Sequence, residues 1–412
     1  MEIKKGYSIP IIDISCKTPH QILVDKEDGV YLGHPTTVLL EDKKTMVIVY
    51  PKNHGSGQIV LKRSGDTGLT WSERLPVPDN WSSSLEVPTV YRMTDADDVE
   101  RLVMFSGLRP IRMAYSEDNG ITWTPLTPIG EYGGVVAIAD IVNTGKGQYI
   151  AMFHDDGRFI TDEITTMTEV YAAGEGTDRR SKLLIRNKQT DGTWSEPKND
   201  WRRIPGRSDD KWTKIHTAFS GNPYADGHFI LYQIRTNDGG LTWSDPERIA
   251  THPTAQLCEP AIIRSPDGNQ LTVLLRENSR KHNGFRLYSN DNGVTWSEPI
   301  ELPGALTGDR HCARYLKDGR LFISFRDTTL ESPTRGDWVA WVGTYDDIIN
   351  GREGQYRVRI MKNYNGQDCA YPAVEILPDG TVVTTTYGHW TKGEEPYIMS
   401  VRINPEVLDG ML

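Results

Sequence analysis

The sequence lacks the features that mark several large classes of protein. No apolar run approaches the roughly 20 residues of a membrane-spanning helix. The formal net charge of −10 over 412 residues has the wrong sign for a nucleic-acid or anionic-membrane partner, so any recognition of an anionic substrate must come from a few local arginines. The first residues lead into strand-like sequence without the apolar core of a signal peptide, which predicts a cytoplasmic chain or a mature form whose leader was removed.

Cysteine and phenylalanine are also scarce. The four cysteines, Cys16, Cys258, Cys312 and Cys369, have no metal-ligand spacing and form no dense disulfide framework. We interpret them as small, buried, reduced residues, and we expect no metal site and no cofactor. The 8 Phe residues are outnumbered by 11 Trp and 18 Tyr, which combine an apolar ring with a polar atom.

What the sequence does contain is an eight-residue pattern that occurs four times. In each copy an Asp can accept hydrogen bonds from nearby backbone N–H groups, and a Gly two positions later supplies a positive φ. Thr and Trp then open the next strand. The unit is strand, Asp turn, strand, and its recurrence is a strong repeat signal. The pattern lacks the alternating acidic ligands and closing Glu of a calcium loop. The copies are residues 64–71, 116–123, 236–243 and 289–296.

These octamers resemble the Asp boxes of the sialidase superfamily, and the resemblance extends over nearly the full chain. It implies an all-β fold, a six-bladed β-propeller with a polar active-site pit at its hub and the boxes on its outer rim. No linker or low-complexity tract divides the chain, so we expect residues 1–412 to form a single domain.

The spacing of the boxes indicates an insertion. Trp71 and Trp123 are 52 residues apart and Trp243 and Trp296 are 53 apart, but 120 residues separate Trp123 from Trp243. A degenerate box at residues 190–194 would give seven blades. An insertion in blade three, spanning roughly residues 160–227, would give six. Segment 195–235 shows only one convincing strand where a four-stranded blade needs three, which favours six blades with the insertion.

Residues 7–14 read as a strand without a box of their own. We expect them to complete the last blade by pairing beside strand 397–403, which would remove the free edge of the ring. Apart from blade three, which carries the insertion, the blades are expected at about residues 31–78, 86–128, 258–303, 310–357 and 370–403.

The resemblance also implies a catalytic apparatus. The anomeric carbon of a sialic-acid-type glycoside bears a carboxylate, which would repel a carboxylate nucleophile, and sialidases use a Tyr instead. In this family a Glu takes the proton of the phenol, three arginines clamp the substrate carboxylate, and an Asp is the acid/base. Glu259, in segment 258–268, matches the Glu-Pro segment of the family. Tyr371, in segment 370–380, matches the nucleophile strand.

Two clamp arginines have matches. Arg276 ends strand 271–277, where the family places one of them. Arg335 stands two residues ahead of Asp337, as another does on blade five, and Arg326 at the end of the preceding strand is its local rival. Both are expected to bind the anionic group of a substrate.

The match breaks at two positions of blade one. The family opens this blade with Arg-Ile-Pro, where this chain has Gly33-His34-Pro35. The acid/base Asp belongs in loop 51–57, where Asn53 is nearest its position and His54 stands beside it. We therefore expect His34 and Asn53 to contact substrate, and His54 to act as the acid/base, because a histidine can exchange a proton near neutral pH.

Other polar residues are candidates for the pit. Segment 308–312 opens blade five, so Arg310 is expected to restore the missing positive charge, with His311 beside it as a further substrate contact. Asp140 and Glu86 are additional polar candidates. Residues 155–158, Asp-Asp-Gly-Arg, read as a strand-end turn.

The sequence thus predicts a glycoside hydrolase of the sialidase superfamily that releases a terminal acidic sugar, sialic acid or a related one, from a glycan or glycoconjugate. The missing arginine and the missing Asp leave the sugar open. Two other interpretations remain: a non-catalytic glycan-binding propeller, and a lyase or other glycosidase that transfers protons through its histidines.

Overall fold

The most apolar runs of the chain form strands that are buried on both faces. Strands β4 (Met46–Pro51), β23 (Leu321–Asp327) and β27 (Val382–Gly388) are buried along their whole length, as expected for strands with a neighbouring layer on each side. This computed structural model describes residues 5–160, 165–174, 180–199, 209–220 and 229–412. Apart from short helical turns, the described residues form strands and loops, which confirms the all-β prediction.

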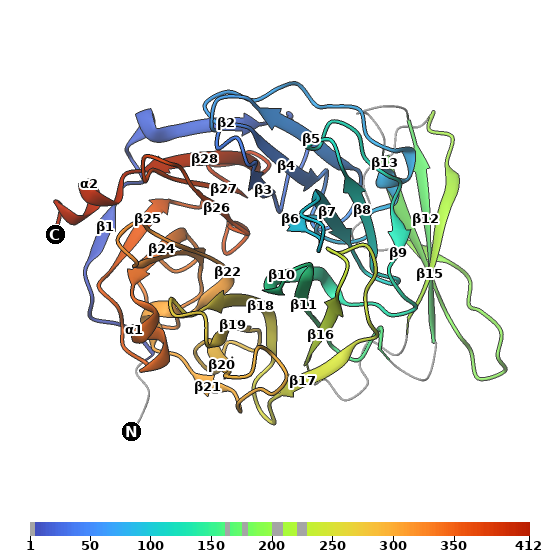
Figure 1. Ribbon diagram of the computed structural model, residues 1–412. Helices are drawn as coiled ribbons and strands as arrows, with labels where there is room; N and C mark the ends of the chain where they lie inside the picture. Colours follow the sequence, from blue (N-terminus) through green and yellow to red (C-terminus); the bar gives the residue numbers. More distant parts are fainter. Residues whose placement is uncertain (1–4, 161–164, 175–179, 200–208, 221–228) are drawn as a thin grey trace.

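Six sheets account for most of the described strands (Figure 1). Sheet 1 contains β3 (Thr36–Leu39), β4 and β5 (Ile59–Ser64); sheet 2 contains β6 (Thr89–Thr94), β7 (Glu100–Ser106), β8 (Arg112–Ser116) and β9 (Thr127–Pro128); sheet 3 contains β10 (Val135–Gly145), β11 (Gln148–Asp155), β16 (Ile230–Thr236) and β17 (Glu247–Thr251). Sheet 4 contains β18 (Leu257–Arg264), β19 (Leu271–Glu277), β20 (Phe285–Ser289) and β21 (Ile300–Glu301); sheet 5 contains β22 (Gly308–Tyr315), β23, β24 (Trp338–Gly343), β25 (Tyr356–Met361) and β1 (Ile11–Asp13); sheet 6 contains β26 (Ala373–Ile376), β27, β28 (Tyr397–Ile403) and β2 (Gln21–Asp25).

The first strands of these sheets face a common centre. Each contacts the first strand of the next sheet, in the cyclic order β3, β6, β10, β18, β22, β26 and back to β3. Figure 1 shows these strands innermost, with the other strands of each sheet extending outward. Residues at the start of six segments far apart in the sequence therefore meet at one place.

Apolar clusters join neighbouring sheets. At about 1.5–3 kcal/mol for each buried Val, Leu or Ile side chain, these clusters are the main favourable contribution to the fold. Each draws residues from two adjacent sheets: Val49 and Val90 from sheets 1 and 2, Phe105 and Phe153 from 2 and 3, Met152 and Val273 from 3 and 4, Leu274 and Ile323 from 4 and 5, Val358 and Val401 from 5 and 6, and Met46 and Val383 from 1 and 6.

The four repeated octamers form the same turn. In the copy after β8, Asp118 accepts hydrogen bonds from the backbone N–H of Thr122 at 2.8 Å and from its hydroxyl at 2.6 Å, while the Ser116 hydroxyl accepts from the N–H of Gly120 at 2.8 Å. The corresponding bonds occur in the other three copies. The glycine of each turn packs against a strand of the preceding sheet; Gly120, for example, lies against Val47 of β4.

The predicted closure by residues 7–14 is wrong. The strand in this region, β1, pairs in parallel with β25 of sheet 5, because Ile12 contributes to the apolar cluster between sheets 5 and 6. Sheet 6 is instead completed by β2, which pairs antiparallel with β28. Asp25 at the end of β2 accepts a 2.7 Å hydrogen bond from Nε of Arg74, so the same strand ties sheet 6 to sheet 1.

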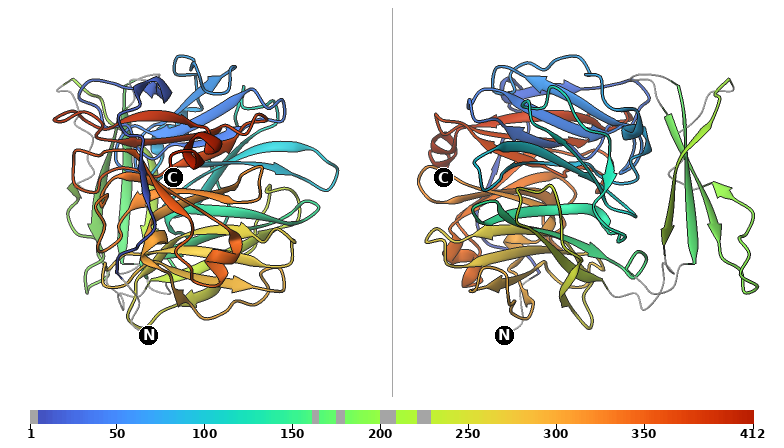
Figure 2. Two further views of the ribbon diagram at one scale, coloured as in Figure 1. Left: turned by 90° about the vertical axis from the view of Figure 1, so that its left-hand side faces the viewer. Right: turned by 45° about the vertical axis from the view of Figure 1, so that its right-hand side comes forward.

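A seventh sheet is formed between β11 and β16. It contains β12 (Thr166–Ala173), β13 (Arg180–Asn187), β14 (Lys198–Asn199) and β15 (Thr213–Ser220), in the order β14-β13-β12-β15. The right-hand view of Figure 2 shows this inserted sheet beside the other six. Val170 and Leu183 pack it against Leu85 and Leu108. Segment 195–235 thus holds β14 and β15 as well as β16, and the expectation of one strand there is wrong.

The helices are short. α1 (Tyr345–Ile349) and α2 (Pro405–Asp409) have five residues each, and a three-residue-per-turn helix spans Asp79–Ser83 beside the inserted sheet. Across the part of the chain that the structure describes, none of the helices has the length and apolar character needed to cross a membrane.

Candidate active site

The centre of the ring holds a buried phenol–carboxylate pair. Tyr371, in the segment leading into β26, donates a hydrogen bond from its hydroxyl to Oε1 of Glu259 in β18. These residues are 8% and 2% exposed. Nη1 of Arg276 donates to the same Oε1 at 2.6 Å and lies 3.3 Å from the Tyr371 hydroxyl oxygen. The carboxylate is placed to take the phenolic proton, and Arg276 to stabilise the negative charge of either group.

The surroundings keep the phenol protonated until a base acts on it. Burial, reinforced by the neighbouring Glu259, raises the pKa of Tyr371 above its ordinary value. Oε2 of Glu259 is buried and has no hydrogen-bond partner among the described residues. The pair therefore consists of a neutral phenol and a carboxylate with one acceptor oxygen still unused.

A left-handed backbone residue stands at the inner start of several sheets and directs its neighbours toward the centre. Glu259 and Arg310 have φ of 49° and 55°, and His34 and Ala370 have φ of 50° and 54°. In β18 and β22 the same residues lie within register shifts of the strand pairing. This conformation is costly for residues other than Gly, so it persists only where the surroundings determine it, as they commonly do at functional sites.

Three arginines next to the pair share one buried carboxylate of the protein itself. Asp309 is fully buried and accepts from Nη1 and Nη2 of Arg280 at 2.6 and 2.7 Å, and from Nε and Nη2 of Arg326 at 2.9 and 2.7 Å. Nε of Arg276 lies 3.4 Å from it. Burial alone would raise the pKa of Asp309, but Arg276, Arg326 and Arg280 outweigh it and hold the pKa well below its usual range. Asp309 thus neutralises part of this positive charge.

Arg310, next to Asp309 in the chain, has no ion pair among the described residues and has an unused donor. It is 9% exposed, its guanidinium lies 5.7 Å from the centre of the Tyr371 ring, and its buried Nη1 has no hydrogen-bond partner among the described residues. It borders a central cavity of about 440 Å³, within the range of small-molecule sites. All six first strands contribute to this cavity, among them Thr37, Val90, Asp140, Ile262, Arg314 and Glu375.

Two histidines from sheet 1 lie on another side of Tyr371. The ring centroid of His34 is 4.6 Å from that of Tyr371, and the ring of His54 is 4.8 Å from that of His34. Burial, together with nearby His54 and Arg326, lowers the pKa of His34 well below its ordinary value, so His34 is neutral at neutral pH. The side chain of His54 is 47% exposed, at the open side of the site, where it can exchange a proton with a bound molecule.

Asp368 links several of these groups, although no sequence motif marks it. Its Oδ1 accepts from the Tyr31 hydroxyl at 2.7 Å and from the Tyr387 hydroxyl at 3.3 Å, and its Oδ2 lies 3.0 Å from Nε2 of His389. The hydroxyl of Tyr31 is also 2.7 Å from Nδ1 of His54. The available signal was its place in a polar loop three residues before Tyr371.

The structure does not bring all the predicted residues together. Arg335 is exposed, and Nη1 donates to the Leu330 carbonyl at 3.4 Å. The place beside Tyr371 is taken by its rival Arg326, whose guanidinium lies 5.5 Å from the centre of the Tyr371 ring. His311 borders the cavity, but its Nε2 lies 3.0 Å from the Leu306 carbonyl and burial lowers its pKa to about 4.

The remaining candidate residues lie farther from the Tyr371–Glu259 pair. Asn53 is half-buried beside His54, in a loop that packs on Glu86: a Cβ on Gly55 would lie 2.6 Å from a Glu86 carboxylate oxygen. Asp140 in β10 accepts from the N–H of Ile262 in β18 at 2.9 Å, so it joins two sheets across the cavity. Asp155 accepts from the backbone of Gly157, Phe159 and Ile160, as in a strand-end turn.

Metal ligation has no candidate group: the described residues contain no cluster of three or more His, Cys, Asp or Glu side chains able to hold an ion.

The chain is similar to one family model and to several known proteins. Residues 213–383 match the family model of BNR repeat-like domains. A sialidase of Clostridium perfringens is 24% identical over 225 residues, which are 45% of this chain and 54% of that protein, so the match spans about half the length of that relative. A solved protein of unknown function from Dyadobacter fermentans, 14% identical, covers 93% of this chain and 97% of its own with a TM-score of 0.57. The sialidase of Trypanosoma rangeli, 12% identical, has a TM-score of 0.49 over 95% of this chain and 58% of its own.

Proposed function

The chain is a BNR-repeat member of the sialidase superfamily, and from this premise we propose that it is a retaining exo-glycosidase that hydrolyses a terminal acidic sugar. We interpret the six sheets around the cavity as the blades of a six-bladed β-propeller, and the seventh sheet as an insertion in blade three of a single domain. The cyclic contacts of the first strands support this assignment.

The observation that carries the proposal is the hydrogen bond from the Tyr371 hydroxyl to Oε1 of Glu259. In the first half of the reaction the Tyr371 oxygen forms a bond to the anomeric carbon, its proton passes to Glu259, and the bond from that carbon to the leaving group breaks. In the second half water attacks the same carbon, the bond to Tyr371 breaks, and Glu259 returns the proton. A neutral phenol suits a substrate whose anomeric carbon carries a carboxylate.

The leaving-group oxygen needs a proton as its bond breaks. We assign this proton to His54, the ionisable residue at the open side of the site, which then accepts a proton from the attacking water. Asn53, in the same loop, is assigned to the substrate side of the site.

The acidic group of the substrate is assigned mainly to Arg310. The nitrogens of Arg326 donate to Asp309, to the Gln367 carbonyl at 2.6 Å and to the Cys369 carbonyl at 3.2 Å, whereas Nη1 of Arg310 has no acceptor among the described residues. Arg276 adds positive charge next to Tyr371, and neutral His34 supplies a polar contact in place of a third arginine. We place His311 behind Arg310, where it supports the strand, and Arg335 outside the site.

The experiment is a turnover screen with aryl glycosides of sialic acids, other ulosonic acids and uronic acids. We expect the wild type to cleave at least one of them, and Tyr371→Phe and Glu259→Gln to lose at least about 100-fold in kcat. Tyr364→Phe, which alters an exposed tyrosine 51% accessible to solvent, is the matched control and should retain activity. Equal rates for wild type and Tyr371→Phe would refute the nucleophile. Binding of a sugar acid without any turnover would identify a glycan-binding protein instead.

A further inference from the structure

A single carboxylate connects the predicted proton donor to a second histidine. Asp368 comes from the loop before β26, and its two oxygens have different partners. Oδ1 faces the hydroxyls of Tyr31 and Tyr387, whereas Oδ2 faces His389. These partners come from the segment before β3 and from the end of β27, so the network joins sheets 1 and 6. The side chain of Asp368 is 28% exposed and that of His389 is 9% exposed.

The Oδ2 side of this network must hold a proton. Nδ1 of His389 lies 2.9 Å from the carbonyl oxygen of Glu394, and because a carbonyl only accepts, Nδ1 carries hydrogen. Its other nitrogen lies 3.0 Å from Oδ2 of Asp368, and two acceptors do not face each other at that distance without a proton between them. Asp368 and His389 therefore share one proton. The side-chain amide of Asn365, 3.1 Å from the same nitrogen, takes the orientation that this proton dictates.

The Oδ1 side fixes the tautomer of His54. The hydroxyl of Tyr31 has one hydrogen, which it donates to Oδ1 of Asp368 at 2.7 Å. The phenolic oxygen then presents a lone pair to Nδ1 of His54, also at 2.7 Å, so this Nδ1 carries the hydrogen of that contact. Nδ1 of His54 lies 3.7 Å from Oδ1, so the tyrosine bridges the two. Nε2 is left as the nitrogen of His54 that gains and loses a proton.

We propose that Asp368 is a positioning residue that, through Tyr31, holds His54 in the Nδ1–H form and stabilises its imidazolium, so that His54 protonates the leaving group from Nε2. This inference rests on the proposed glycosidase function. The proton at Nε2 moves to the glycosidic oxygen as the carbon–oxygen bond breaks, and Nε2 takes a proton back from the water that attacks in the second half. Asp368 keeps its charge state throughout and does not touch the substrate. Its carboxylate replaces, from another loop, the acidic group that blade one lacks.

The first test compares two leaving groups on the same sugar. The probes are the 4-methylumbelliferyl α-ketoside of N-acetylneuraminic acid, whose leaving group needs little protonation, and 3′-sialyllactose, whose leaving group needs it. We expect Asp368→Asn and Tyr31→Phe each to lose about 100-fold in kcat/KM on sialyllactose, within the range of general acid catalysis, and at most about threefold on the aryl ketoside. Equal losses on both probes, or no loss on either, would overturn the proposal.

A matched variant controls for the loss of an Asp in the same sheet. Asp379→Asn alters the turn between β26 and β27, where Asp379 accepts from the N–H of Thr381 at 2.8 Å, and should leave both rates unchanged. Thermal unfolding of each variant shows whether it is folded. If Asp368→Asn does not fold, Tyr31→Phe tests the same link with the carboxylate and its contact to His389 intact.

The second test does not require turnover. Long-range proton–nitrogen NMR spectra of the histidine rings report the tautomer of His54 directly. We expect the Nδ1–H form in the wild type and a loss of that preference in both Tyr31→Phe and Asp368→Asn. The same tautomer in all three proteins would overturn the proposal. If the wild type cleaves neither probe, the choice of sugar or the proposed function fails, and the NMR result still decides whether Asp368 controls His54.

Discussion

Four arginines surround the Tyr371–Glu259 pair, but their charges are not equally available to a substrate. Arg276, Arg280 and Arg326 are ion-paired with Asp309, which is fully buried. An incoming anion would compete with this carboxylate for their donors. Arg310 is not ion-paired in the described structure and retains a buried donor without a partner. Arg276, Arg280 and Arg326 therefore organise the site, whereas Arg310 is the arginine suited to bind an acidic ligand.

Replacing Arg310 should therefore weaken binding more than catalysis. A hydrogen bond between charged groups contributes about 1.5–3 kcal/mol, so Arg310→Gln should raise KM for an acidic aryl glycoside about tenfold or more, with kcat changed by less than about threefold. Arg335→Gln, at the exposed arginine of the same sheet, is the matched control and should leave KM unchanged. Steady-state kinetics of the two variants measures both values. An unchanged KM in Arg310→Gln would remove Arg310 from the substrate side of the site.

The parts of the site that the sequence predicts are those carried by continuous motifs. Glu259 and Tyr371 each precede a strand and a Pro-Asp-Gly turn, and the structure brings them into contact. The preference for Arg335 over Arg326 depends on a short pattern, Arg-x-Asp, in the loop before β24, where Arg335 is exposed to solvent and Asp337 is buried. Arg326 lies in β23, and its neighbour in the pairing register is Asp309, next to the centre.

The missed residues depend on contacts between distant segments. Asp368 meets a tyrosine 337 residues away in the sequence and a histidine 21 residues away, and neither spacing forms a pattern. Asp309 lies in segment 308–312, from which the sequence predicts Arg310 as a site residue. The three arginines that pair with Asp309, however, come from two different sheets. Arg310, the residue after Asp309, has a positive φ and turns the strand. Arginine is not a residue type that predicts this conformation. Long-range hydrogen bonds and strand bulges are the features that a single sequence does not predict.

At the scale of single elements, the octamer turns join neighbouring sheets, and their glycines make this testable. Gly293 has φ of 82° and packs against the preceding sheet, where a Cβ would clash with Cδ1 of Ile150 in β11. Gly268, in the turn between β18 and β19, has φ of 78°, and a Cβ added there would meet nothing within 4 Å. Gly268 therefore has the same backbone conformation without the contact.

Alanine at these two glycines should separate backbone strain from packing. Gly268→Ala should lower the free energy of unfolding by about 1 kcal/mol, the cost of a left-handed non-glycine residue. Gly293→Ala should lower it by about 1–3 kcal/mol more, because the new methyl group overpacks the contact between sheets 3 and 4. Urea unfolding at 25 °C measures both. Equal losses would show that the octamer turn does not join the sheets through this contact.

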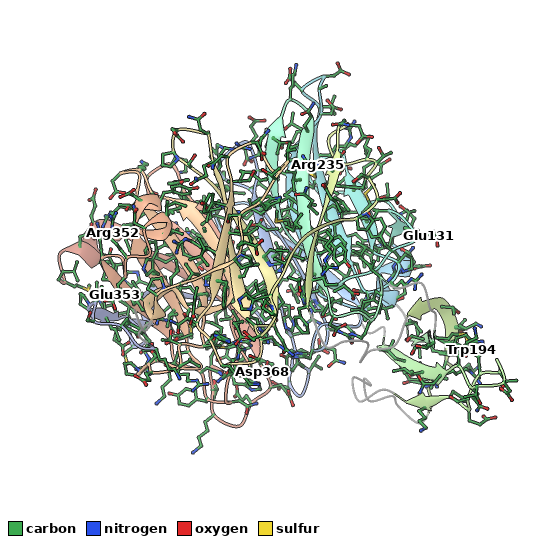
Figure 3. All side chains as sticks on the ribbon, turned by 90° about the horizontal axis from the view of Figure 1, so that it is seen from below. Glu131, Trp194, Arg235, Arg352, Glu353 and Asp368 are labelled. Carbon is green, nitrogen blue, oxygen red and sulfur yellow. The ribbon has the colours of Figure 1, made fainter. Side chains whose placement is uncertain are left out.

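At the scale of the whole molecule, the six sheets of the ring and the inserted sheet contribute differently to the candidate site. Each of the six sheets contributes to the central cavity. The inserted sheet packs on the six through one small apolar cluster (Leu85, Leu108, Val170 and Leu183). In Figure 3 Trp194 of the inserted sheet and Asp368 both lie toward the lower side of the view, whereas Arg235 lies toward the upper side. The inserted sheet therefore extends on the side of the ring that carries Asp368.

Removing the inserted sheet should leave the fold and the chemistry intact. Asp155 and Ile230 are direct partners in the pairing of β11 with β16, so the ends of the excursion lie close together, and a short Gly/Ser linker in place of residues 161–228 can rejoin them. Loss of the small cluster exposes Leu85 and Leu108, so the melting temperature should fall by a few degrees, as expected for about 1–2 kcal/mol. The kcat/KM for an aryl glycoside should stay within about threefold of the wild type, because no residue of the proposed chemistry lies in the excised segment.

Circular dichroism shows whether the variant is folded. A folded variant that binds aryl glycosides normally but no longer binds the glycan substrate would show that the inserted sheet selects the aglycone. A folded variant inactive on every substrate would show instead that residues of the insertion complete the active site.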